Sequence, residues 1–175
     1  PLPWDKRDID LAMDSWVTHE FNEEWEQENW RLSLVNAGHI PGAGMLKVET
    51  ENKDILFTGD FDTRDSPLTN GAKPHDVDML FIEGTYGGRD HANQQEELDR
   101  FIENVIRVTD KGGTVLIPAF ANGRTQDMLI RLYQNCPELD VHVDGMGKRI
   151  TKLQLENSQF LRDPKLLNDA WNWSK

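Results

Sequence analysis

Three short blocks of this sequence end an apolar run with glycine and with a histidine or a carboxylate. In chain order they are residues 37–44 with His39, residues 57–60 with Asp60, and residues 81–87 with Glu83. A loop at the end of a buried strand is where a sheet presents functional side chains to solvent. Imidazole and carboxylate groups from neighbouring strand ends are the ligands of metal-dependent hydrolases. The pattern therefore predicts a metallo-hydrolase site, or part of one.

His39 and Asp60 are the predicted metal ligands. A neutral imidazole binds Zn²⁺ at about 2.0–2.1 Å, and the two oxygens of a carboxylate can bridge two cations about 3.5–4 Å apart. The alternatives are a structural histidine at position 39 and a turn-capping aspartate at position 60. We interpret Asp62 and Asp65 as turn residues of this second kind, with Arg64 neutralising the cluster.

Asp60 and Glu83 are the predicted catalytic residues. Glu83 ends the apolar run 79–82, and partial desolvation by such a run is expected to raise the pKa of a carboxyl group. A carboxylate at this place can position a histidine that acts as an acid or a base. The alternative is a structural ion pair of Glu83 with Arg89 or a lysine.

A phosphate site is predicted in residues 118–124, which connect a strand to the start of a helix. Free N–H groups at a helix N-terminus favour an anion, and arginine adds a forked set of donors. The predicted phosphate-binding residues are Asn122, Gly123 and Arg124. The alternative is a plain connection with the arginine on the surface. The other histidines have no partner at ligand spacing and are interpreted as surface or loop residues: His19, His75, His91 and His142.

The composition limits the function classes. The chain has 175 residues, which permits one domain, or one and part of another, and Pro1 in place of Met is expected of an excised or processed segment. The net charge of −12 opposes direct binding to a phosphate backbone, unless acidic groups surround a cation that attracts phosphate. The alternative is a solvated acidic surface. Cys136 is the only cysteine, so a reducing, cytoplasmic setting is expected. No apolar run has membrane-spanning length.

Hydrophobic periodicity predicts an antiparallel meander followed by alternating strands and helices. The expected strands are residues 30–35, 45–50, 55–58, 77–82, 114–117 and 141–143, with residues 20–28 as a loop or a marginal strand. The expected helices are residues 5–16, 92–109, 123–134, 148–155 and 164–171. The apolar runs 77–82 and 114–117 are predicted to be buried strands, and the later part to consist of parallel βαβ units. The change of pattern near Gly87 or Gly88 indicates that two architectures meet there.

Four blocks in this order and spacing resemble the β-CASP branch of the metallo-β-lactamase-fold nucleases, which includes ribonuclease J and the endonuclease of mRNA 3′-end processing. They are residues 37–44, 57–64, 81–87 and 116–126. The resemblance covers nearly the whole chain, with Gly84 where serine is expected. It implies that His39 is a ligand of one zinc ion, that Asp60 bridges two, and that Glu83 orients a proton-donating histidine.

The resemblance also implies an α/β fold in two parts. Residues 1–87 would be the later part of a metallo-β-lactamase αββα domain, and residues 88–175 would begin a Rossmann-like β-CASP domain. The His-x-His-x-Asp-His block and the late histidine motifs of the family are not in this sequence. A catalytic zinc site uses about three protein ligands, so we expect that His39 and Asp60 alone do not form a complete dinuclear site in the isolated chain.

Three functions remain open, and the first is preferred. It is a Zn²⁺-dependent phosphodiester hydrolase of ribonuclease type, or a fragment of one, with Mn²⁺ as the alternative metal and single-stranded RNA, or DNA, as its partner. The second is a non-catalytic truncated homologue that serves as an assembly or RNA-contact module. The third is a mononuclear hydrolase built on His39, Asp60 and a nearby side chain. Uncovered strand edges predict association into a homo-oligomer, and no membrane partner is expected.

Overall fold

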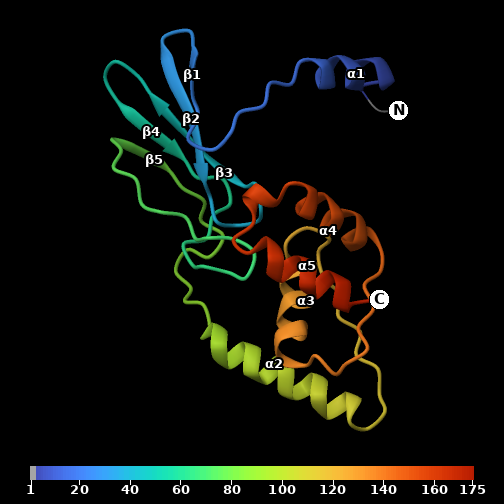
Figure 1. The fold of residues 1–175 in the computed structure, drawn as a ribbon. Helices are drawn as coiled ribbons and strands as arrows, with labels where there is room; N and C mark the ends of the chain where they lie inside the picture. Colours follow the sequence, from blue (N-terminus) through green and yellow to red (C-terminus); the bar gives the residue numbers. More distant parts are fainter. Residues whose placement is uncertain (1–2) are drawn as a thin grey trace.

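A five-stranded sheet and five α-helices make up the fold (Figure 1), in agreement with the predicted α/β class. The computed structural model describes residues 3–175. The strands are β1 (Glu24–Gln27), β2 (Trp30–Asn36), β3 (Gly44–Glu49), β4 (Asp54–Phe57) and β5 (Met79–Phe81). The helices are α1 (Lys6–Asp14), α2 (Gln94–Thr109), α3 (Arg124–Asn135), α4 (Met146–Glu156) and α5 (Pro164–Trp173), with a 3₁₀ turn η1 at Ser158–Phe160. None of the helices within residues 3–175 is both long enough and apolar enough to cross a bilayer.

The strands lie in the sheet in chain order, β1-β2-β3-β4-β5. β1 to β4 pair antiparallel, which confirms the predicted meander. β5 pairs parallel with β4, with Phe57 opposite Phe81, and the two rings stack with their centroids 4.6 Å apart. Parallel strands end at the same edge of a sheet. The loops that follow β4 and β5 therefore leave the sheet as neighbours.

β5 differs from the prediction for residues 77–82. The strand is shorter than predicted, and its side chains are exposed rather than buried, with Leu80 51 % exposed. β5 is the last strand of the sheet, so one of its edges is unpaired among the described residues. A continuous apolar run shows that a strand is suited to burial on both faces. Such a run does not ensure that other described segments of the chain pack over both faces of the strand.

Two further strand predictions are wrong. Residues 114–117 and 141–143 form no strand. The Leu116 side chain is 91 % exposed, and Val141 and Val143 exchange backbone hydrogen bonds of 2.9 and 3.2 Å with Lys175 alone. A β-strand forms only where a ladder of backbone hydrogen bonds joins it to a neighbouring strand. Among the described residues, neither segment has such a neighbouring strand.

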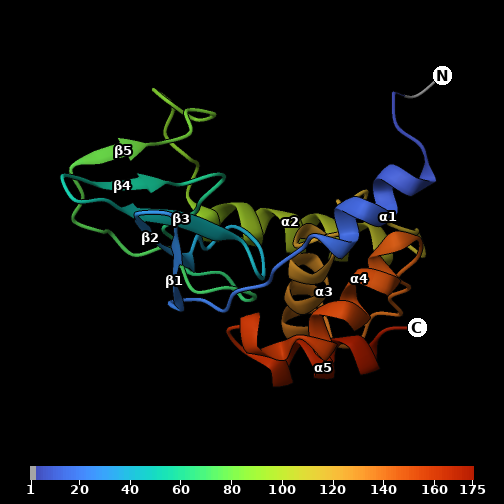
Figure 2. The same cartoon turned by 90° about the horizontal axis from the view of Figure 1, so that it is seen from above.

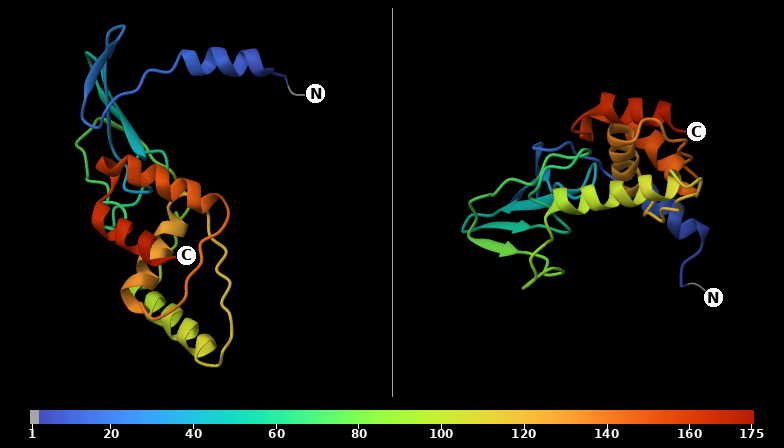
Figure 3. Two further views of the ribbon diagram at one scale, coloured as in Figure 1. Left: turned by 45° about the vertical axis from the view of Figure 1, so that its right-hand side comes forward. Right: turned by 90° about the horizontal axis from the view of Figure 1, so that it is seen from below.

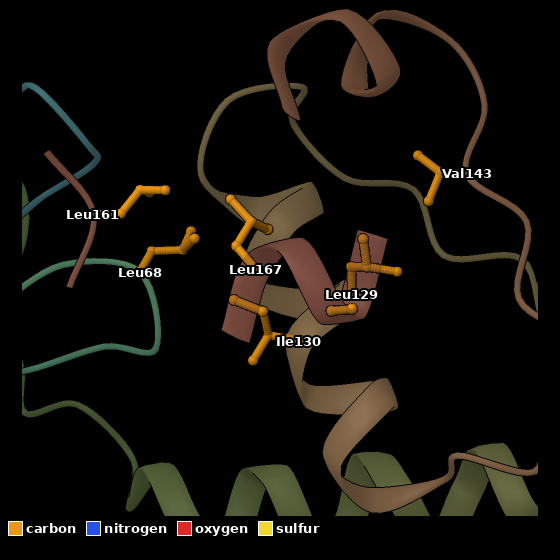
Figure 4. Packing of buried hydrophobic residues seen from close by; sticks show 7 residues of the cluster. Leu68, Leu129, Ile130, Val143, Leu161 and Leu167 are labelled. Carbon is orange, nitrogen blue, oxygen red and sulfur yellow. The ribbon is translucent and has the colours of Figure 1, made fainter. Parts of the chain in front are cut away.

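The helices α3, α4 and α5 pack beside the sheet rather than over one of its faces (Figures 1 and 2). Their core is formed by seven buried residues, six of them labelled in Figure 4: Leu68, Leu129, Ile130, Val143, Leu161, Leu167 and Ala170. α1 projects away from the sheet (Figure 3) and has no buried residue. α2 buries only Val105.

Leu68 joins the two halves of the molecule. It belongs to the long loop of residues 58–72 that follows β4, yet its side chain lies in the helical core. Its carbonyl accepts a 2.8 Å hydrogen bond from the backbone N–H of Arg162. The proposed division at residues 87 and 88 stays a prediction. The contacts of Leu68 show that loop 58–72 packs against elements on both sides of this division in the sequence.

Gly38 is the point where loop 58–72 crosses the end of β2. The Asp62 N–H donates to the Ala37 carbonyl at 2.9 Å, and the Ala72 N–H donates to the Asp62 carbonyl at 2.8 Å. A Cβ at Gly38 would lie 2.3 Å from the Asp62 carbonyl oxygen and 2.5 Å from the Ala72 nitrogen. These contacts are with backbone, which cannot rotate away. The glycine at position 38 thus allows the close passage of another chain segment.

We predict that Gly38→Ala destabilises the fold far more than Gly42→Ala. Both glycines have left-handed φ values, +70° and +84°, but a Cβ at Gly42 would have no atom within 4 Å. Gly42→Ala should therefore cost only the conformational penalty of about 1–2 kcal/mol, whereas Gly38→Ala adds the clash with loop 58–72. Urea unfolding followed by circular dichroism measures both. Equal midpoints for the two variants would contradict this account.

Candidate functional site

One cleft of about 1050 Å³ lies where the strand ends meet the start of α3. Its walls come from the loops after β2, β4 and β5 and from the N-terminal part of α3. It is lined by all six residues that the sequence predicts for the site: His39, Asp60, Glu83, Asn122, Gly123 and Arg124. Segments more than eighty positions apart in the sequence thus face a common space. The roles of these residues stay predictions.

Thr58 connects the loop that carries Asp60 with the loop that carries Glu83. Its side chain is 3 % exposed, and its hydroxyl donates to the Gly59 carbonyl at 2.8 Å and accepts from the Glu83 N–H at 3.4 Å. The Thr58 N–H also donates to the Phe81 carbonyl at 3.0 Å. Gly59, with φ +53°, then turns the chain toward Asp60. The parallel pairing of β4 and β5 therefore continues into the cleft.

The pKa of Glu83 is lowered, which corrects the predicted increase. The main cause is hydrogen bonding from Thr85, through its side chain and its backbone N–H, the latter at 2.8 Å from the carboxylate. A Coulombic interaction with His39 also acts in the lowering direction. Desolvation acts in the raising direction but is outweighed, because the carboxylate lies in the open cleft and not inside the apolar strand. The alternative ion pair with Arg89 is not formed within residues 3–175.

Asp62 and Asp65 are turn residues, as predicted. The Asp62 carboxylate accepts from the Arg64 N–H at 2.9 Å and pairs with the Arg64 guanidinium at 2.7 Å. This hydrogen-bonded arginine lowers the pKa of Asp62. The Asp65 carboxylate accepts from the Gly71 N–H at 2.9 Å, which lowers its pKa also. Both carboxylates stabilise the shape of loop 58–72.

Asp127 engages the two arginines of α3 that line the cleft. Arg131 lies 3.0 Å from its carboxylate and Arg124 lies 3.5 Å from it. Arg131 is nearly buried, whereas the Arg124 side chain is 63 % exposed. Arg124 therefore remains accessible to an anion in the cleft, while Arg131 is a structural partner of Asp127.

Asp60 and Glu83 are the cleft carboxylates without an ion pair in the described residues, because Asp62 and Asp127 already have arginine partners. Two anionic groups in one cleft repel each other in the absence of a cation. Their position beside His39 is suited to an electropositive ligand. Within residues 3–175, however, no three His, Cys, Asp or Glu side chains approach closely enough to hold a metal ion by themselves.

The N-terminus of α3 is organised by Gln126, which is fully buried. Its carbonyl oxygen accepts from the Gly123 N–H at 2.8 Å, and its amide nitrogen donates to the Ala121 carbonyl at 3.0 Å and to the Thr151 hydroxyl at 2.9 Å. The next two N–H groups, of Arg124 and Thr125, donate to backbone carbonyls. These N–H groups are therefore already satisfied, and an anion here would depend on side chains.

Asn122 is also held in place. Its side-chain oxygen accepts a 2.7 Å hydrogen bond from Gln154 on α4. A Cβ at Gly123 would lie 2.6 Å from a methyl group of Ile40, so the start of α3 packs directly against the neighbour of His39. The three residues predicted to bind phosphate thus have structural contacts, and Arg124 is the one with an exposed charged group.

The cleft residues that the sequence did not assign to the site include Tyr86, His91 and Phe120. The Tyr86 and His91 rings lie 4.6 Å apart, tilted by 48°. We expected His91 to be a surface or loop histidine, and it lies in a loop, but that loop forms the cleft wall. No spacing signal distinguishes these aromatic residues from others in the chain, so only the fold reveals their position.

Comparison with known proteins identifies relatives along nearly the whole chain. RNase aCSPSF2 of Saccharolobus solfataricus is 35% identical over 174 residues, which are 98% of this chain and 35% of the relative. Probable RNase MJ4 of Methanocaldococcus jannaschii is 33% identical over 97% of this chain and 41% of the relative. Cleavage and polyadenylation specificity factor subunit 3 of Dictyostelium discoideum is 36% identical over 74% of this chain and 17% of the relative.

The chain belongs to the β-CASP family of metallo-β-lactamase-fold nucleases. No family model matches the sequence, so the assignment rests on these pairwise relationships. The family consists of metal-dependent nucleases. This chain spans about a third to two fifths of the two archaeal relatives that it matches along almost its full length.

We predict that Gln126→Leu lowers the free energy of unfolding by about 1–3 kcal/mol, the cost of leaving buried polar groups unpaired. The substitution removes the partners of the Gly123 N–H and the Thr151 hydroxyl. Gln134→Leu on the exposed side of the same helix is the matched control and should change stability little. Chemical unfolding of both variants measures the difference. A neutral Gln126→Leu would contradict the structural role of this side chain.

We predict that Thr85→Val raises the pKa of Glu83 toward its ordinary value, because it removes the hydroxyl and keeps the side-chain shape. A lowered pKa means that this contact stabilises the fold above the ordinary pKa of Glu and that the stabilisation is lost as the pH falls through the lowered value. Side-chain ¹³C NMR titration measures the pKa, with Thr109→Val on α2 as the control. A Glu83 pKa that is unchanged in Thr85→Val would show that the Thr85 hydroxyl is not a cause of the lowered value.

Proposed function

We propose that this chain is a segment of a Zn²⁺-dependent phosphodiester hydrolase of ribonuclease type that acts on single-stranded RNA. The observation that supports it best is the single cleft that contains His39, Asp60, Glu83 and Arg124. The relatives bear names of ribonucleases and of an RNA-processing factor. Their names are consistent with a phosphodiester substrate for this cleft.

His39 and Asp60 would hold the metal, since they combine an imidazole with a carboxylate that lacks an ion pair in the described residues. These two donors fit part of a zinc site, and further ligands must come from outside this set. A bound metal ion in such a site supplies Lewis-acid polarisation of the phosphate and neutralisation of its charge.

The other residues would orient the substrate and the proton transfers. The lowered pKa of Glu83 keeps this group ionised at neutral pH, so it would act as a hydrogen-bond acceptor that holds a histidine in one orientation. Arg124 would donate to a phosphate oxygen from the opposite wall of the cleft. The Thr58 hydroxyl would keep the Asp60 and Glu83 loops at a fixed separation.

The alternative is a non-catalytic homologue that serves as an assembly or RNA-contact module. Within residues 3–175 no three His, Cys, Asp or Glu side chains are close enough to hold a metal ion, and this alternative requires no such group. In either case the uncovered apolar side chains of β5 support association of the chain into a homo-oligomer. The buried free thiol of Cys136 supports placement in the reducing cytoplasm.

We predict that metal-dependent cleavage of labelled single-stranded RNA is reduced by about 100-fold or more in Asp60→Asn, the scale of losing one group that stabilises the transition state. The protein of which this chain is a segment, which would supply the remaining metal ligands, is assayed with Zn²⁺ or Mn²⁺, and single-stranded DNA is tested in parallel. Asp14→Asn in α1 removes a carboxylate outside the cleft and should leave the rate unchanged.

The other outcomes separate the alternatives. RNA binding without cleavage would favour the non-catalytic module over the hydrolase. Cleavage that survives in Asp60→Asn would remove Asp60 from the mechanism. If a protein that unfolds cooperatively shows no RNA binding and no RNA cleavage, both functions are contradicted.

A further inference from the structure

Two aromatic side chains line the cleft with most of their surface exposed. Tyr86 is 58 % exposed and Phe120 is 85 % exposed. Tyr86 belongs to the turn after β5, and Phe120 to the connection before α3, so they come from the two halves of the chain. Exposed aromatic surface that gathers in a concave site marks a ligand-binding region rather than ordinary surface composition.

The backbone beneath each ring is fixed. The Phe120 carbonyl accepts from both the N–H and the hydroxyl of Thr125, at 3.1 and 2.8 Å. The Tyr86 turn is closed by a 3.0 Å hydrogen bond from the Gly87 N–H to the Gly84 carbonyl. The Tyr86 carbonyl accepts from the Arg89 N–H, also at 3.0 Å. Both rings are therefore presented from hydrogen-bonded turns, which reduces the ordering cost of binding.

The charges of the cleft indicate what these rings bind. The three arginines that line it are each paired with an aspartate, Arg64 with Asp62 and the other two with Asp127. The whole chain has a net charge of −12. Contacts with phosphates therefore contribute less here than in a basic nucleic-acid-binding surface, and a larger share of the favourable binding is left to uncharged groups of the ligand.

Unpaired nucleobases are such groups. Every base has an aromatic face, and stacking on protein aromatic side chains is worth about 1–3 kcal/mol per base. Bases within a duplex are already stacked and cannot reach these rings. The neutral rings at Tyr86 and Phe120 line the same cleft as the accessible guanidinium of Arg124, and together they match an unpaired base followed by its phosphate.

We propose that Tyr86 and Phe120 form a base-stacking subsite, and that this subsite restricts the cleft to single-stranded nucleic acid. The inference rests on the proposed function, because it assumes that the cleft receives a polynucleotide. It adds the class of group that is recognised, the bases, and the side chains that recognise it. The subsite lies in the same cleft as Asp60 and Glu83, so it would also set which phosphate of the strand lies near the candidate metal ligands.

The test compares the affinities of the chain for three fluorescein-labelled RNA molecules by anisotropy: an unstructured strand, the same length with abasic residues, and a blunt duplex. We expect the unstructured strand to bind more tightly than both others. We expect Tyr86→Leu and Phe120→Leu to weaken its binding by about 5- to 150-fold each, with little effect on the abasic strand. Trp16→Leu removes an aromatic ring of similar exposure outside the cleft and is the control.

The possible failures are distinguishable. If the wild-type chain binds none of the three molecules, the RNA-binding part of the proposed function is wrong, and this inference with it. If the abasic strand binds as tightly as the base-containing strand, or if both leucine variants bind as the wild type does, the stacking subsite is wrong while the proposed function stands. The abasic comparison uses the wild-type chain and so does not depend on the folding of any variant.

Discussion

The close approach of Gly38 to the backbone of loop 58–72 is the constraint on which the remaining structure depends. Asp62 is hydrogen-bonded to Ala37 on one side and to Ala72 on the other, which leaves no room for a side chain at Gly38. This crossing fixes His39 relative to Asp60. The same loop inserts Leu68 into the helical core, so one segment determines both the geometry of the cleft and the placement of the helices beside the sheet.

The sequence predicts those features that local pattern determines. The meander, the helix α2 and the helix α3 follow from alternation, helical spacing and glycine stops, and the structure confirms them. The clustering of His39, Asp60 and Glu83 was also predictable, since each follows a strand end. The parallel pairing of β4 and β5 then brings the two carboxylates together by a rule of sheet topology.

The errors concern properties that depend on neighbours. Residues 114–117 have the composition of a buried strand but lack a ladder partner among the described residues, and β5 lacks cover for its faces. The predicted increase in the pKa of Glu83 was based on the apolar strand that precedes Glu83, and not on the hydrogen bonds from Thr85, which follows it. The N–H groups of α3 were expected to be free, but the side chain of Gln126 and nearby carbonyls occupy them. The missing strand neighbours are a matter of tertiary structure, whereas Thr85 and Gln126 are close in sequence and only the folded geometry shows which groups they bind.

The exposed segment 114–117 affects the tendency of the molecules to associate in solution. A short β-prone stretch with Leu116 almost fully exposed is the type of sequence that nucleates intermolecular sheets. Pro118 directly after it cannot donate to a ladder and acts as a gatekeeper. The strong negative charge provides a second barrier through mutual repulsion between molecules. Added salt shortens the range of this repulsion to about 8 Å at physiological ionic strength, so dilute buffers favour dispersed molecules and salt favours clustering.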